Sequence, residues 1–309
     1  MDARSLRLLT KQEYTAKITV AVGTKSQLAF AHEGGKLTYL ELDIATRSLL
    51  VLGEQSLDHD IACLSLETTL SVGEDSSPPK SSFLAMGLWT DNSVRILNVP
   101  DLRELQRINL GPDVPQIRDV MIAPLSGHTG PGNTSTQKRT GNLLIGLGNG
   151  TLVTYLIDFS DIVLSVFNRQ DIDLGARPLN FSCFVNDGAL CVFVCGERPT
   201  VVFSRRNNDS LLFSPVNISG DVSNMVPFNS ASCPECLAMT SEAGLLIGSI
   251  DSLNKIHVQK YALGEAPRHI CHHKTSATLA GNYSCTHLSR YIYYYYYSII
   301  YWGLERLCS

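Results

Sequence analysis

The chain has 309 residues, enough for one large domain or two ordinary ones. Its hydrophobic share of 44% excludes a disordered chain, and its formal net charge of −4 disfavours direct, charge-driven binding to nucleic acid. The first thirty residues do not combine a basic start, an apolar run and a small-residue cleavage site, so an intracellular, reducing compartment is expected. The nine cysteines, an odd number lying mostly in apolar runs, are expected to be buried thiols rather than disulfides.

Short runs rich in Val, Ile and Leu recur along the whole chain, with few helix-length amphipathic stretches between them. This pattern is typical of an all-β protein. In chain order, strands are expected at 18–22, 28–31, 36–42 and 49–52; 61–66, 83–89, 94–99 and 105–110; 117–125, 143–147, 152–157 and 162–167; and 180–185, 190–195, 200–203 and 211–216. A fifth unit runs from 223 through 237 to 240 and continues with 245–250 and 255–261, and 268–271 starts a sixth.

Each group of four runs predicts a four-stranded antiparallel meander. The turns recur roughly every 46 to 58 residues, near the 40 to 50 of β-propeller blades. The two wider intervals contain 71–80 and 126–141, which are poor in apolar residues and are expected to be surface loops. A blade cannot bury its faces alone, and propellers commonly close with about four to eight blades. Five repeats and the start of a sixth therefore indicate either a small propeller or a piece of a longer protein.

The end of the chain differs in composition from the rest. Residues 291–302 read YIYYYYYSIIYW, and only fourteen residues separate Arg290 from Glu305, fewer than the roughly 18 to 20 that a membrane span needs. We expect 276–309 to be a non-native tail, with a membrane-surface or partner-binding segment as the alternative. Such a tail favours the interpretation that the chain is part of a longer protein.

The motifs that could carry chemistry favour structural explanations. Residues 146–150 read GLGNG, but a strand follows where a phosphate-binding loop would open a helix, so a hairpin turn is expected. The Cys233-x-x-Cys236 motif and the His/Cys cluster at 269–273 resemble half of a zinc site, yet no second Cys-x-x-Cys supports it. Adjacent side chains of Asp58-His59-Asp60 would point to opposite sides of an extended segment and could not act on one substrate atom. We predict no catalytic residue, metal or cofactor.

Trp89 is the strongest candidate for a recognition residue. It ends an apolar strand beside a predicted turn at residues 90–92, where it either caps the blade core or anchors a protein partner. If 61–66 and 83–89 pair antiparallel, the start of the first strand lies beside the end of the second. Asp60 and Trp89 would then share one face and be open to a single partner.

A family resemblance is carried by five segments in a fixed order: HDIACLSL, FLAMGLWTDNSVRILNVPDL, LLIGLGNGTLVTYLI, CGERPTVVFS and LLIGSIDSLNKIHVQKYALGEAPRHIC. They closely resemble the DNA damage-binding protein 1 family, whose sister families are large subunits of cleavage/polyadenylation and splicing factors. The resemblance implies an architecture of three seven-bladed propellers, which members of that family carry in a much longer chain. The resemblance implies that residues 1–221 are later blades of the second propeller, that 222–275 open the next propeller, and that 276–309 are a tail.

The resemblance also implies a function. It points to a non-catalytic scaffold or adaptor module of a cullin-RING ubiquitin ligase, linked to DNA damage repair and protein ubiquitination and found in the nucleus and cytoplasm. In the family the second propeller docks the cullin scaffold, while the first and third clasp substrate-receptor proteins. An acidic residue before the ACL strand and the tryptophan of GLWTD match the cullin-facing surface, which implies this role for Asp60 and Trp89.

Nucleic acid would be contacted only indirectly, through the complex, and no membrane is implied. The alternative function is a propeller subunit of an mRNA 3'-end processing or splicing complex, as in the sister families. A weaker alternative is a propeller enzyme, which would gather polar or metal-ligating side chains around a central channel. The sequence gives no convincing cluster of that kind.

Overall fold

The computed structural model describes residues 11–43, 46–68, 80–125, 140–159, 164–186, 188–204, 210–218, 220–229, 234–250, 256–261, 267–273 and 278–283. Most of the two predicted surface loops, at 71–80 and 126–141, lies outside these ranges. So do Cys233 and the tyrosine-rich run at 291–302.

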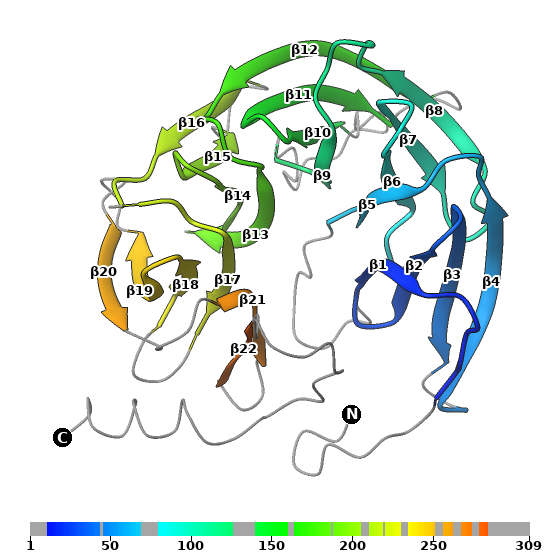
Figure 1. Cartoon of the computed structure of the whole chain (residues 1–309), viewed down its shortest axis with the longest axis horizontal. Coiled ribbons are helices and arrows are strands. Elements are labelled where there is room, and N and C mark those ends of the chain that lie inside the picture. Colours follow the sequence, from blue (N-terminus) through cyan, green and yellow to red (C-terminus); the bar gives the residue numbers. More distant parts are fainter. Residues whose placement is uncertain are drawn as a thin grey trace, which may run out of the picture. The chain divides into compact units, whose positions relative to one another are not determined.

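The described residues form β-strands joined by turns, as Figure 1 shows. The strands of the first three sheets are β1 (Ile18–Gly23), β2 (Gln27–His32), β3 (Lys36–Asp43), β4 (Ser48–Ser56), β5 (Ile61–Leu66), β6 (Phe83–Leu88), β7 (Ser93–Asn98), β8 (Glu104–Asn109), β9 (Ile117–Ala123), β10 (Thr140–Leu147), β11 (Thr151–Asp158) and β12 (Ser165–Asp173). The later strands are β13 (Asn180–Asn186), β14 (Ala189–Cys195), β15 (Thr200–Ser204), β16 (Leu211–Pro215), β17 (Asn224–Phe228), β18 (Cys236–Ser241), β19 (Gly244–Ile250), β20 (Ile256–Tyr261), β21 (Pro267–His273) and β22 (Thr278–Tyr283).

These strands make five four-stranded sheets and one two-stranded sheet in the described part of the chain. In every sheet, strands that follow one another along the chain are neighbours, so each is a meander (Figure 1). The predicted four-stranded antiparallel meanders and the all-β class are confirmed. The sequence does not predict β22, which lies in the segment expected to be a tail and pairs antiparallel with β21.

The chain divides into two compact units, residues 1–181 with 203–212, and residues 182–202 with 213–309. In the first unit, alternate residues of successive sheets pack against one another in an aliphatic core that includes the fully buried Ile96, Ile117 and Ile145. The second unit has a smaller core around Phe228 and Leu279. Of the five cysteines whose side chains are described, none forms a disulfide, and three are buried: Cys63, Cys191 and Cys195.

A buried glutamine joins the first sheet to the second. The side-chain Nε2 of Gln27 donates to the main-chain oxygen of Ser81 at 2.9 Å and to the Tyr39 hydroxyl at 2.7 Å. The main-chain N–H of Ser81 donates back to Gln27 Oε1 at 2.8 Å. Because an unpaired buried polar group costs stability, this reciprocal pairing fixes the chain that leads into β6 against the first sheet.

Candidate functional site

The ends of β5 and β6 bring Asp60 and Trp89 together. Ile61 pairs with Leu88 in the antiparallel ladder, and the N–H of Trp89 donates to the main-chain oxygen of Asp60 at 3.0 Å. The predicted strand pairing is thereby confirmed. The Asp60 side chain is exposed and Trp89 is partly buried, so both are accessible at the same end of the sheet.

A glycine turn of the first sheet supports the segment before β5. The N–H of Gly34 donates to Asp60 Oδ1 at 2.9 Å, and Leu57 donates its N–H to the oxygen of Gly35 at 3.0 Å. Gly35 has a φ of +77°, and a Cβ at this position would lie only 2.7 Å from the main-chain oxygen of His59. Only glycine allows both the left-handed backbone and this close approach.

Trp89 lies beneath an arginine of the neighbouring sheet. The guanidinium carbon of Arg118, from β9, lies 5.4 Å from the centre of the Trp89 ring, a cation–π distance. Leu88, one residue earlier, is fully buried and fills the core, whereas Trp89 keeps part of its ring at the surface. The ring therefore rests on the sheet with part of its surface exposed, and its role as a partner anchor stays a prediction.

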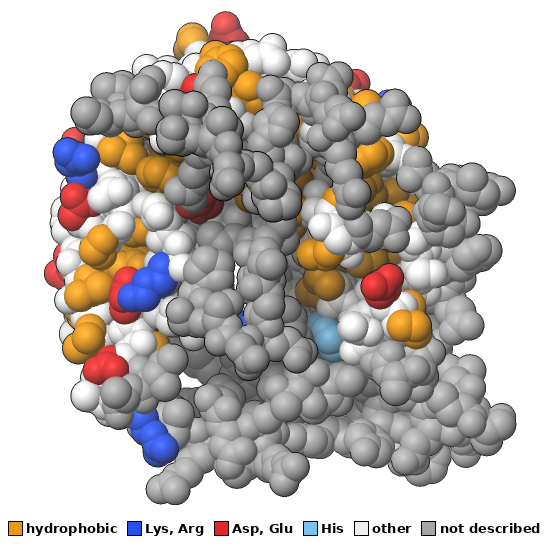
Figure 2. All heavy atoms as spheres, turned by 180° about the vertical axis from the view of Figure 1, so that it is seen from behind, with side chains coloured by type: hydrophobic (Ala, Val, Ile, Leu, Met, Phe, Trp, Pro, Cys, Tyr) orange, Lys and Arg blue, Asp and Glu red, His pale blue; other side chains and the backbone are white. Residues whose placement is uncertain are grey.

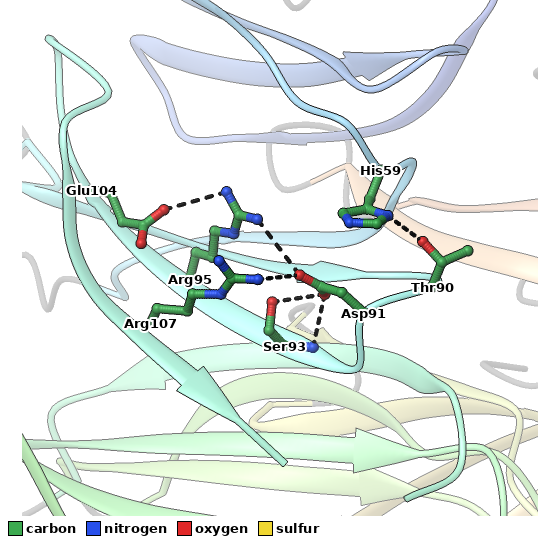
Figure 3. Close-up of polar contacts among 7 residues, drawn as sticks. All are labelled: His59, Thr90, Asp91, Ser93, Arg95, Glu104 and Arg107. Carbon is green, nitrogen blue, oxygen red and sulfur yellow. Dashed lines mark hydrogen bonds and ion pairs between the residues drawn. The ribbon is translucent and has the colours of Figure 1, made fainter. Parts of the chain in front are cut away.

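A side-chain hydrogen bond links the residues next to this pair. Thr90 Oγ1 and His59 Nδ1 lie 2.6 Å apart (Figure 3). His59 precedes Asp60 and Thr90 follows Trp89, so the two strand ends are tied by this bond as well as by the main-chain bond. We call the set His59, Asp60, Trp89, Thr90 and Arg118 the strand-end surface.

The turn after the tryptophan is held by Asp91. Its carboxylate accepts bonds from the N–H and hydroxyl of Ser93 at 3.0 and 2.7 Å, and it pairs with Arg107 at 2.8 Å and Arg95 at 3.5 Å (Figure 3). Burial acts to raise the pKa of Asp91, but the Ser93 bonds and the two guanidinium groups outweigh it, so this pKa lies below its ordinary value. A carboxylate held in its charged form keeps the turn in one conformation.

The strand-end surface presents an aromatic ring, a cation and a carboxylate. Among the residues that the structure describes, no three His, Cys, Asp or Glu side chains are grouped so that they could hold a metal ion. Of the half zinc site considered from the sequence, Cys233 lies outside the described residues, Cys236 is partly buried, and His272 packs edge-on against Phe228 at 5.1 Å. Aromatic rings bordered by charged groups are common in contacts between proteins, and that role for this surface stays a prediction.

Sequence reasoning missed Arg118 and the bond between His59 and Thr90. Arg118 reaches Trp89 from the following sheet, and no local pattern predicts which side chains meet between sheets. Residues 58–60 form a connection in which Asp58 and Asp60 are exposed, whereas His59 is partly buried and hydrogen-bonded to Thr90.

Comparison with known proteins identifies the family. Residues 3–250 match the family model described as the RSE1/DDB1/CPSF1 second beta-propeller. The chain belongs to this family of β-propeller proteins. It is 37% identical over 263 residues to DNA damage-binding protein 1 of Oryza sativa subsp. japonica, and 35% identical over 263 residues both to DNA damage-binding protein 1b of Arabidopsis thaliana and to DNA damage-binding protein 1 of Solanum lycopersicum.

These alignments cover 85% of the chain but only 22% of each relative, so the chain spans about a fifth of the curated relatives it matches. The resemblance to the DNA damage-binding protein 1 family is confirmed. The match to the second propeller continues to residue 250, and the proposed domain boundary at residue 221 stays a prediction. No helix in the described residues is long and apolar enough to cross a membrane.

Proposed function

We propose that this chain is a non-catalytic scaffold module that binds a cullin through the strand-end surface and so contributes to a cullin-RING ubiquitin ligase. The single observation that carries the proposal is the main-chain bond from Trp89 to Asp60, which sets an exposed carboxylate beside an accessible indole. Both residues are the ones for which the family resemblance implies a cullin-facing role. Substrate-receptor proteins would bind elsewhere on the same scaffold.

The names of the relatives support a role in the response to DNA damage, exercised in the nucleus through partner proteins. The sister RNA-processing function is less well supported, because the three relatives named above are DNA damage-binding proteins. A binding hot spot usually consists of an aromatic anchor with polar contacts around it. Arg118 and Asp60 supply that polar surrounding for Trp89.

The test is a direct measurement of cullin binding in a full-length context, with variants of the strand-end surface compared with variants of exposed residues elsewhere. Loss of affinity confined to strand-end variants supports the proposal. Equal affinity for all variants contradicts it.

Asp60→Ala is expected to weaken cullin binding by less than about tenfold, mainly through a slower association rate, because exposed charges act on encounter more than on dissociation. Asp60→Asn is the matched control, since it keeps an acceptor for the Gly34 N–H and removes only the charge. Association rates measured at low and high salt should differ for the wild type and converge for both variants. Identical salt dependence in all three would exclude an electrostatic role for Asp60.

The isolated chain is expected not to bind DNA tightly, whether damaged or intact. Its formal net charge is −4. On the face of the molecule that Figure 2 shows, the basic and acidic side chains of the described residues are interspersed rather than gathered in a basic patch. Fluorescence anisotropy with a labelled duplex at physiological salt measures this. Sub-micromolar binding with a steep salt dependence would overturn the expectation and favour direct contact with nucleic acid.

A further inference from the structure

The outer edge of the first sheet has no neighbour among the described strands. The strand order of this sheet is β1-β2-β3-β4, so β4 is a terminal strand, and it lies on the outside of its sheet in Figure 1. A terminal strand leaves main-chain N–H and C=O groups unpaired along its outer side. β4 carries none of the residues of the strand-end surface, so a contact made at this edge is independent of the proposed cullin contact.

Three consecutive apolar side chains are exposed on β4: Leu50 at 46%, Val51 at 43% and Leu52 at 45%. In a regular strand, successive side chains point to opposite faces of the sheet. The ladder to β3 skips one residue of β4, because Val51 and Gly53 pair with consecutive residues of β3, and Leu52 is therefore the extra residue of a β-bulge. Residues 48–51 pair with β3 in unbroken register, so this part of the edge is a regular strand.

The other two outer strands of the first unit carry charges within the strand. Arg107 lies in β8, and Arg169 and Asp171 lie in β12. Charged side chains on an edge strand oppose its pairing with a further strand. The sequence of β4 has no charged residue from 48 to 53, so its apolar stretch lacks the protection that the other two edges have.

The two ends of this apolar stretch have opposite charges. Arg47 directly precedes β4 and is exposed, and Glu54 follows the stretch, where its exposed carboxylate pairs with Lys36 at 2.9 Å. When two copies of β4 lie side by side and run in opposite directions, Arg47 of each copy lies near Glu54 of the other. A parallel arrangement would instead set like charges against each other. The strand is therefore complementary to a second copy of itself in the antiparallel direction.

We propose that the outer edge of β4 is an association site for a second copy of this chain, formed by antiparallel pairing of two β4 strands about a two-fold axis. Main-chain hydrogen bonds and contacts among the exposed side chains at 50–52 hold the copies together, and the two Arg47–Glu54 pairs set the direction. Contact along one short strand buries less than the roughly 1,200 Å² of a stable interface, so the dimer exchanges with the monomer.

Sedimentation equilibrium of the whole chain at about 10 to 500 µM measures this association. The average mass of the wild type should rise with concentration toward twice the monomer mass. Val51→Lys places a charge in the apolar stretch and should weaken association at least about tenfold. Phe167→Lys, at a residue 42% exposed on the outer strand β12, is the matched control and should leave association unchanged. A wild type that stays monomeric over the whole range, or a Val51→Lys variant that associates equally well, would overturn the proposal.

Charge reversal tests whether the occupant is a second copy and in which direction it runs. Arg47→Glu and Glu54→Lys should each weaken association, because like charges then meet at both ends of the pair. An equimolar mixture of the two variants should associate like the wild type, since position 47 of each variant then faces an opposite charge at position 54 of the other. The ion pair lost with Glu54 is exposed on both sides, so thermal melts should show folded variants. A mixture that associates no better than its components contradicts the proposal.

Discussion

Trp89→Ala in a full-length context should weaken cullin binding by at least about thirtyfold, equivalent to about 2 kcal/mol. The substitution removes the indole that lies beneath Arg118, with the ring centre 5.4 Å from the guanidinium carbon, and so removes the apolar anchor of the strand-end surface. Isothermal titration or a quantitative pull-down with the cullin measures the loss. Because Trp89 and Asp60 are adjacent, the effects of the two alanine variants should not be additive if both meet the same partner segment.

The control separates binding from folding. A fully buried aromatic ring that is truncated to alanine costs roughly 3 to 5 kcal/mol of stability, and the partly exposed Trp89 should cost less. Phe167→Ala, which removes an aromatic side chain that is 42% exposed on another sheet, serves as the matched variant and should leave cullin binding unchanged. Unchanged binding by Trp89→Ala, or a loss that thermal melts attribute entirely to unfolding, would sink the interface assignment and leave Trp89 as part of the core.

The chain should also become more stable as the pH falls from about 8 to about 5, by roughly 2 kcal/mol, because of Asp119. Burial raises the pKa of Asp119 from 3.8 to about 7, although its carboxylate accepts the N–H groups of Phe181 at 2.7 Å and Val120 at 2.9 Å. These bonds favour the charged form, and the desolvation of the carboxylate outweighs them.

The direction of this pH effect on stability follows from the pKa values of Asp119 in the unfolded and the folded chain. The unfolded chain releases the Asp119 proton near pH 3.8, whereas the folded chain keeps it until about pH 7, so protonation favours folding between these values. The contribution is fully present below the unfolded value and is lost as the pH rises through the folded one. Asp91 acts in the opposite direction, but its lowered pKa confines its effect to pH values below about 3.8, and Cys63 titrates only above its ordinary value of 9.0.

Asp119→Asn tests this assignment. The amide oxygen can still accept the Phe181 N–H, but the NH₂ group cannot accept the Val120 N–H, so the variant keeps part of the contact and loses the titration. Denaturant unfolding at a series of pH values should give a flatter stability profile between about pH 4 and 7 for the variant. Parallel profiles for the two proteins would show that another group controls this range.

The sequence by itself determined the strands and their order. Aliphatic runs bounded by turn residues predicted most strands to within three residues, as with β5 at Ile61–Leu66 and β19 at Gly244–Ile250. A meander pairs strands that are neighbours in the chain, so this local signal also predicted which strands pair. The adjacency of Asp60 and Trp89 followed from that pairing alone. The exceptions are β12, which ends at Asp173 rather than near residue 167, β17 and β18, which fall in one predicted run at 223–240, and β22, which lies in the segment expected to be a tail.

Only the tertiary structure decided which side chains surround Asp60 and Trp89 and which contacts join one sheet to the next. Three contacts join one sheet to another: the Arg118 guanidinium over the Trp89 ring, the hydrogen bond from Gln27 to Ser81, and the hydrogen bond from the N–H of Phe181 to Asp119. The two hydrogen bonds join residues that are 54 and 62 positions apart in the chain. The bulge at Leu52 depends equally on how β4 fits its neighbour. Alternation fixes which face of a strand is buried, but the side chains that meet across two packed faces depend on how the sheets stack, and no short stretch of sequence encodes that.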